Sequence, residues 1–324
     1  MRRFVGIAMV DRRWPSFGVI ASAALVALAL GLASPEHAAG QSSAPEPKEI
    51  KLTTDDGVTL GATYYPSRSG RDAVPVVMLH DFKQNRAVFR DMAYFLQDPP
   101  DPSLPSHAVV TVDLRGHGES TTAVVRGGGS VEISAARLST RDFAAMVLGD
   151  MEAVRRELVS LNDQGQLNLN KLTLIGAGMG ANVALNWAAK DWATPRLASR
   201  KQGQDVKALV LLSPKWKSRG LPVLRALKQP GVQQQVSFFI AFGRQDRKQK
   251  KDAETIYKNL ERFHPEPPRD QVREKKSLFM VPVPSGLSGT DLLNRTEGLP
   301  SQVADFIDAR VSSKDFEWVG RKKQ

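Results

Sequence analysis

The chain has 324 residues, a formal net charge of +11 and no cysteine. This length suits one large domain or two small ones. The lack of cysteine excludes disulfides, thiolate nucleophiles and cysteine-based metal sites. With 41% hydrophobic and 24% charged residues, the composition is that of a globular protein with a sizeable core.

The first 40 residues have the pattern of an export signal. Four arginines precede an uncharged apolar run at residues 17–33, and small residues follow at 38–40. A charged start, an apolar run and a small-residue cleavage site are typical of a secretory signal. The run is also nearly long enough to span a bilayer. We therefore expect an exported, periplasmic protein with residues 41–48 as a linker, or a membrane-anchored one if residues 1–40 are not cleaved.

Strand-like and helix-like segments alternate through the rest of the chain. A hairpin is expected first, from two strand-like runs around the turn signal at residues 55–57. Buried strands are then expected at residues 74–80, 108–114, 172–175, 206–212, 236–242 and 277–283, and helices at residues 86–97, 141–161 and 179–190, near 223, and around 253–263 and 303–311. These repeated units predict an α/β fold with a mostly parallel twisted sheet and helices on both faces. We place this domain at residues 49–315.

Three other segments bear on function. Residues 119–140, with three glycines at 127–129, are the longest candidate for a mobile flap over an active site. The connection at 213–235 is too short for a large cap domain. Basic residues cluster at 244–251 and in the tail at 316–324. Without a nucleic-acid motif or an aromatic platform, we interpret both clusters as solvated surface and expect no nucleic-acid binding.

The most informative segment is the glycine-rich turn after the strand at 172–175. It reads Gly176-Ala177-Gly178-Met179-Gly180 and leads into a helix. This is the context of the G-x-S-x-G nucleophile elbow, in which a serine on a sharp turn attacks a carbonyl. Gly178 stands at the serine position, and a glycine has no atom that can attack.

Together with two other loops, this turn gives the chain a resemblance to the α/β-hydrolase family, near its cap-less esterases and serine-peptidase-like members. Residues 79–82 (LHDF) resemble the His-Gly-x oxyanion loop. Residues 112–120 (VDLRGHGES) resemble the D-x-R-G-H-G-x-S loop after the fourth strand. The resemblance covers residues 50–312. It implies an α/β-hydrolase fold and, in an intact member, a serine, a histidine and an acid that together cleave an ester or amide.

The resemblance also implies where the acid and the histidine would lie. Residues 243–246 (GRQD) match the G-x-x-D turn, so Asp246 corresponds to the acid, with a helix N-cap as its other possible role. In the loop after the last strand, Ser288 precedes Gly289 at the histidine position. A serine hydroxyl cannot accept a proton near neutral pH as an imidazole does. Two of the three triad positions are therefore substituted.

The oxyanion donors implied by the family are backbone amides, here those of Phe82 and Met179. They need no particular side chain and can persist. Asp81 replaces the usual glycine and brings a carboxylate near the oxyanion position, which is unfavourable for acyl transfer. His80 and His117 belong to family loops in which the histidine is usually structural.

We interpret the chain as a pseudoenzyme of the hydrolase family that binds a small acyl or ester-like ligand, or a partner, at the vestigial pocket. We expect no cofactor and no metal. One alternative is an active hydrolase in which Ser120, Ser213 or Ser288 attacks, or in which Asp246 activates a water. A second is a nucleotide-binding oxidoreductase, because residues 176–181 formally fit G-x-G-x-x-A.

Overall fold

The computed structural model describes residues 44–101, 103–125, 127–195, 197 and 201–321. The expected signal segment at residues 1–40 lies outside these residues. The predictions of export and of membrane anchoring, which depend on that segment, therefore stay predictions. In the described part of the chain, no helix combines the length and the apolar character needed to cross a membrane.

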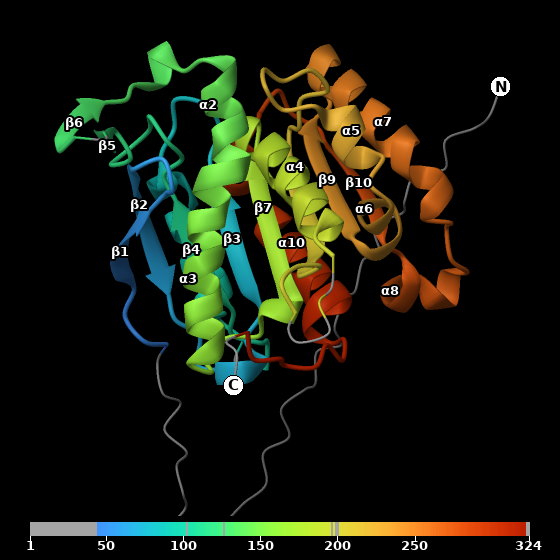
Figure 1. The fold of residues 1–324 in the computed structure, drawn as a ribbon. Coiled ribbons are helices and arrows are strands. Elements are labelled where there is room, and N and C mark those ends of the chain that lie inside the picture. The colour runs from blue at the N-terminus through green and yellow to red at the C-terminus, as the bar shows by residue number, and fades with distance from the viewer. Residues whose placement is uncertain (1–43, 102, 126, 196, 198–200, 322–324) are drawn as a thin grey trace, which may run out of the picture. The chain divides into compact units, whose positions relative to one another are not determined.

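A single ten-stranded sheet forms the centre of the described domain (Figure 1). Its order is β10-β9-β8-β7-β3-β4-β2-β5-β6, with β1 paired to β2. The strands from β10 to β4 are parallel, whereas β2, β5, β6 and β1 pair antiparallel. The strands are β1 Lys48–Thr53, β2 Val58–Tyr65, β3 Pro75–Leu79, β4 Ala108–Val112, β5 Thr122–Val125, β6 Gly129–Glu132, β7 Leu172–Ala177, β8 Val206–Leu212, β9 Ser237–Gly243 and β10 Leu278–Val283.

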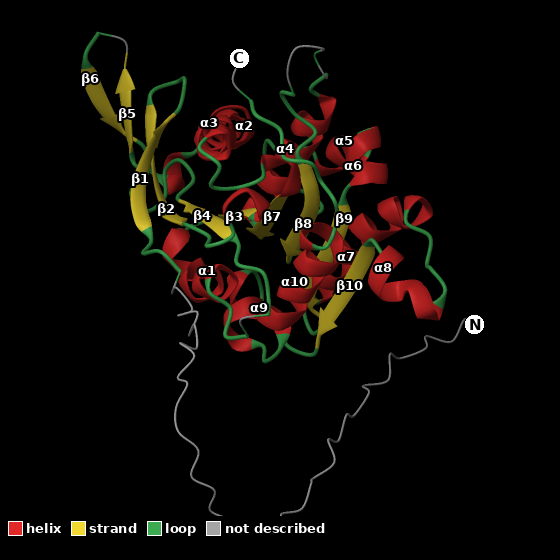
Figure 2. Ribbon diagram, turned by 90° about the horizontal axis from the view of Figure 1, so that it is seen from below, coloured by secondary structure: helices red, strands yellow, loops and turns green. Residues whose placement is uncertain are grey.

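Helices cover both faces of this sheet (Figure 2). One core joins the sheet to α3, α4 and α7, and the other joins it to α1, α9 and α10. Neighbouring residues of β3 alternate between the two, with Leu79 in the first core and Met78 in the second, as the two-residue period of a strand requires. The helices are α1 Arg90–Gln97, α2 Thr140–Ala145, α3 Met151–Asp163, α4 Met179–Ala193, α5 Val223–Leu227, α6 Pro230–Gln235, α7 Arg247–Leu260, α8 Val272–Lys275, α9 Thr290–Arg295 and α10 Leu299–Ile307.

Most expected elements are present, and the differences are local. The segment predicted as a flap at 119–140 contains the hairpin of β5 and β6, which sequence analysis missed because both strands are short and mostly exposed. The predicted helix at 141–161 is two α-helices joined by a π-helical stretch at Met146–Asp150. The segment at 86–97 begins as a 3₁₀ helix, Arg86–Phe89, before α1.

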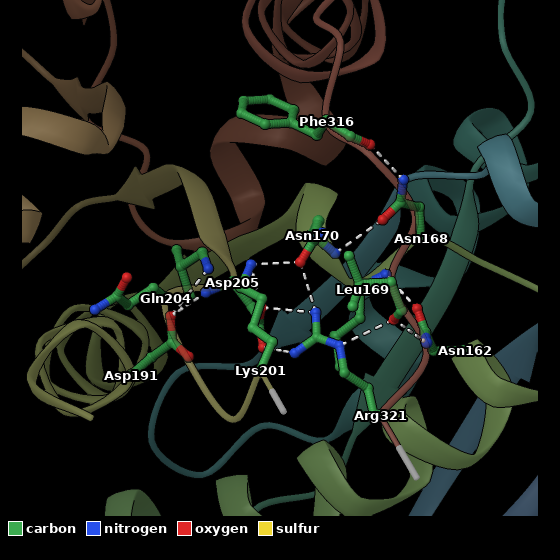
Figure 3. Close-up of polar contacts among 12 residues, drawn as sticks. Asn162, Asn168, Leu169, Asn170, Asp191, Lys201, Gln204, Asp205, Phe316 and Arg321 are labelled. Atoms are coloured by element: carbon green, nitrogen blue, oxygen red, sulfur yellow. Dashed lines mark hydrogen bonds and ion pairs between the residues drawn. The ribbon is translucent and has the colours of Figure 1, made fainter. Parts of the chain in front are cut away.

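Sequence analysis predicts a solvated basic tail at residues 316–324, but residues 316–321 pack against the domain. Residues 316–321 lie against the segments that lead into β7 and β8 (Figure 3). The side-chain amide of Asn168 donates to the carbonyl of Phe316 at 2.7 Å. Arg321 is buried, and its guanidinium lies 2.8 Å from the Asp205 carboxylate. Arg321 is therefore part of the folded domain and not of a solvated tail.

Candidate functional site

Gly178 forms the turn between β7 and α4, as expected for an elbow. Its φ is +50°, a conformation that glycine adopts without a steric penalty. The neighbouring Gly180 allows close packing, because a Cβ there would lie 2.1 Å from the carbonyl oxygen of Leu79 in β3. The segment therefore has the tight strand-to-helix geometry of an elbow, without a nucleophilic side chain.

Asp81 fills the space beside Gly178. A Cβ on Gly178 would lie 2.1 Å from Asp81 Cγ. Asp81 Oδ1 accepts hydrogen bonds from the backbone amides of Phe82 and Met179, each at 2.7 Å. These are the two amides that the sequence suggests as oxyanion donors. Their hydrogen bonds are thus made to the protein's own carboxylate.

Lys215 provides the counter-charge for this carboxylate. Its Nζ lies 3.1 Å from Asp81 Oδ1 and 3.4 Å from Oδ2. Asn182 on α4 fixes the Lys215 backbone, accepting from its amide at 3.1 Å and donating to its carbonyl at 2.7 Å. Because the Lys215 side chain is 44% exposed, this ion pair contributes about 0–1 kcal/mol. The hydrogen bonds from the two backbone amides to the charged Asp81 contribute roughly 1.5–3 kcal/mol each. These two hydrogen bonds therefore do most to hold Asp81 in place.

His80 braces the loop that carries Asp81. Its Nδ1 lies 2.7 Å from the Asp81 carbonyl oxygen, and its Nε2 accepts from the Leu114 amide at 3.1 Å. This pattern assigns the proton to Nδ1. Burial lowers the pKa of His80 to about 4, so the ring is neutral at pH 7. Both ring nitrogens are occupied by backbone groups, which leaves His80 a structural role.

Asp246, which the sequence resemblance predicts at the acid position, caps α7. Its Oδ1 accepts from the amides of Lys248 and Gln249 at 2.8 and 3.0 Å, and its Oδ2 accepts from Gln249 Nε2 at 3.1 Å. The hydrogen bonds from Gln249 hold the pKa of Asp246 below its usual value. None of the described histidines bonds to this carboxylate, so its observed role is that of an N-cap.

A chain of contacts links this cap to the elbow. Gln249 Oε1 accepts from the Ser213 hydroxyl at 2.7 Å, and the Ser213 oxygen accepts from the Gly289 amide at 2.9 Å. A Cβ on Gly289 would lie 3.8 Å from Asp81 Oδ2. The last loop therefore lies beside the Asp81 carboxylate, and Ser288 in that loop is exposed.

The other two candidate serines lie in structural settings. The Ser213 hydroxyl donates to the Gln249 amide oxygen, which cannot act as a base near neutral pH. Ser120 is fully buried, and its hydroxyl donates to the Asp113 carbonyl at 2.6 Å and accepts from the Gly61 amide at 2.9 Å. Neither hydroxyl has the neighbouring base that activates a serine nucleophile.

Two observations on the described residues concern metal and nucleotide binding. In residues that the structure describes, no group of three or more His, Cys, Asp or Glu side chains is arranged to hold a metal ion. The dinucleotide-like pattern at 176–181 follows β7, whereas the dinucleotide-binding motif normally lies in the first βα turn of its fold. A Cβ on Gly176 would lie 2.5 Å from the Ala181 backbone, so this glycine serves helix–strand packing.

Sequence analysis missed two residues of this site, Lys215 and Asn182. Lys215 follows β8 directly after Ser213-Pro214, and sites in parallel sheets gather at the carboxyl ends of strands. A cation just after a strand was therefore a usable signal. Asn182 lies inside a helix, and nothing in its local sequence indicates that it fixes Lys215.

Comparison with known proteins agrees with this architecture. A family model described as the alpha/beta hydrolase fold matches residues 74–253, and the chain belongs to this family. No curated protein matches it.

Among solved structures, the chain is similar to the Pyrococcus furiosus esterase Pf2001, with 16% identity, a TM-score of 0.55 and coverage of 82% of this chain and 93% of that one. It is similar to the alpha/beta hydrolase GrgF from Penicillium sp. sh18, with 15% identity, a TM-score of 0.51 and coverage of 83% and 100%. It is also similar to the Pyrococcus horikoshii acylaminoacyl peptidase, with 14% identity, a TM-score of 0.55 and coverage of 86% and 44%. At these identities the likeness concerns the fold.

Proposed function

We propose that this chain is a non-hydrolytic member of the α/β-hydrolase family that acts by binding. The observation that carries the proposal is the Asp81 carboxylate, which accepts the amides of both Phe82 and Met179. A substrate carbonyl would need the same two donors. The negative charge that develops on it during acyl transfer would meet a carboxylate, which opposes the reaction.

The remaining triad positions support the same proposal. Gly178 supplies no nucleophile. Asp246 caps a helix and bonds to no described histidine, so no described base–acid pair exists to activate a serine or a water.

The acyl or ester-like ligand suggested by the family would have to displace Asp81 from two charge-assisted hydrogen bonds. We therefore propose that the ligand or partner binds away from the amides of Phe82 and Met179. An acyl ligand should bind to the amides of Phe82 and Met179 more tightly in an Asp81→Gly variant than in the wild type.

Ester hydrolysis by the purified protein tests the proposal. With short p-nitrophenyl esters, we expect no rate above that of the Asp246→Asn variant or of a non-enzymatic protein at the same concentration. A fluorophosphonate probe is expected to leave the wild type unlabelled. A saturable rate that is lost in Asp246→Asn would overturn the proposal and would instead indicate a hydrolase with a non-standard nucleophile.

A further inference from the structure

A pocket of about 360 Å³ lies outside the elbow region, beside the segments that lead into β7 and β8. It is lined by α3, by the carboxyl half of α4, and by Lys201, Gln202 and Arg321. Five of its lining side chains are cationic, namely Arg155, Arg156, Lys190, Lys201 and Arg321. A pocket of this volume can hold a small molecule, and its lining selects for a charged one.

On one side of the pocket, a single carboxylate serves two cations. Glu152 Oε1 lies 2.6 Å from Lys190 Nζ, and Glu152 Oε2 lies 3.0 Å from Arg155 Nε. The indole of Trp187 also donates to Oε1 at 3.0 Å, which fixes the carboxylate. Arg155 uses only its Nε in this pair, so within the described chain its two Nη groups have no protein partner.

On the other side, a second carboxylate again serves two cations (Figure 3). Asp205 lies 3.0 Å from Lys201 Nζ and accepts from both Nη groups of Arg321 at 3.0 and 2.8 Å. Asp205 is fully buried. Burial lowers the pKa of Lys201 even with Asp205 beside it, because removal from water disfavours the charged form of the amine.

The pocket is also lined by one further cation, Arg156, and one further carboxylate, Asp191. Arg156 pairs with Asp55 at 3.0 Å. Asp191 accepts from the Asp205 amide at 2.7 Å, and burial together with the nearby Asp205 carboxylate raises the pKa of Asp191. With their partners Asp55 and Asp205 included, the five cations of the lining face four carboxylates, which leaves an excess of one positive charge.

We propose that this pocket binds the phosphate group of a small hydrophilic molecule. A phosphate monoester carries a charge of about −1.5 to −2 at pH 7, which the excess of cations at the pocket would attract. The free Nη groups of Arg155 suit bidentate contact with phosphate oxygens, and Lys190 adds a point charge. The polar lining and the volume suit a sugar-sized remainder. This inference does not depend on whether the elbow is catalytic.

Calorimetric titration of the full chain tests the proposal. The probes are inorganic phosphate, glucose 6-phosphate and, as the neutral control, glucose, all at one ionic strength because screening weakens charged contacts. We expect saturable binding of glucose 6-phosphate, and of inorganic phosphate if the phosphate group alone suffices. Glucose should give no saturable heat.

Variants locate the binding. Arg155→Gln and Lys190→Gln should each weaken binding of glucose 6-phosphate about tenfold, whereas Arg155→Lys should recover part of the loss. Arg225→Gln, a change of the same chemistry at an exposed position of α5, should leave the affinity unchanged. Absence of saturable binding by either phosphate would overturn the proposal, and so would equal affinities in folded Arg155→Gln and wild type.

Discussion

The two ends of the parallel strands differ in how their charges and hydrogen bonds are matched. At the carboxyl ends, Lys215 is the one cation of the described chain that pairs with Asp81, and Asp81 also accepts the two amides that a substrate would use. Near the amino ends of β7 and β8, Glu152 and Asp205 each serve two cations. Ligands of open α/β sheets usually bind at the carboxyl ends. In this chain, a pocket lined by five cations lies at the opposite end, so the fold alone does not locate binding.

The largest expected effect comes from opening the carboxyl end. The variant Asp81→Gly/Gly178→Ser/Ser288→His removes the carboxylate from the oxyanion amides and supplies a nucleophile and a base. We expect it to react with a fluorophosphonate probe and to hydrolyse p-nitrophenyl acetate at least about 10²-fold faster than wild type, the scale of general-base catalysis.

The matched control is Gly178→Ser/Ser288→His with Asp81 retained. Its serine Cβ would lie 2.1 Å from Asp81 Cγ, so we expect far slower labelling. If the double variant labels as fast as the triple, Asp81 does not block the site. If a folded triple variant fails to label, Ser288 does not occupy the histidine position.

The next effect concerns the amino end. Arg321→Met leaves Asp205, which is fully buried, with Lys201 as its remaining cation. Breaking a buried pair on one side is strongly destabilising, and we expect a loss of about 3 kcal/mol in the free energy of unfolding measured by urea denaturation. Arg225→Met, at an exposed position of α5, is the control. A loss below about 1 kcal/mol for Arg321→Met would mean that this charge cluster is not a stabilising element.

A smaller, pH-dependent effect belongs to His80 at the carboxyl end. Its folded pKa of about 4 lies below the ordinary value of 6.5, so the unfolded chain binds the proton first as pH falls. The stability that His80 provides is therefore present above pH 6.5 and is lost between about pH 6.5 and 4. Between pH 7 and 4.5 we expect this histidine to account for about 2 kcal/mol of lost stability. His80→Gln should lose less stability than wild type over this interval, and equal losses would contradict the prediction.

The smallest effect is expected at Lys215. Its side chain is 44% exposed, and exposed ion pairs contribute little. Lys215→Met should lower the free energy of unfolding by no more than about 1 kcal/mol, measured alongside Arg321→Met under the same conditions. A loss as large as that of Arg321→Met would remove the contrast between the two ends.

The sequence predicted the parts of this molecule that depend on local pattern. Continuous apolar runs identified the buried parallel strands, and the glycine spacing around Gly178 identified the elbow. The place of Asp81 in its loop also put a carboxylate near the oxyanion position. Its acceptance of both amides could not be predicted, because it depends on side-chain dihedrals and on the packing of β7 against β3.

Long-range charge pairing was equally hidden. Arg321 looked like part of a solvated basic run, because its partner Asp205 lies 116 residues earlier. The local sequence around Asp205 or Arg321 does not indicate that the two residues pair. The hairpin of β5 and β6 was missed for another reason, since exposed strands carry no alternating apolar pattern.

The separation between Asp205 and Arg321 has a consequence for synthesis on the ribosome. Asp205 and its neighbour Lys201 leave the exit tunnel well before Arg321 has been translated. Until then, Lys201, four residues away, is the only one of these two cations available to Asp205. A nascent chain that stalls before Arg321 thus has an incomplete charge cluster beside β8.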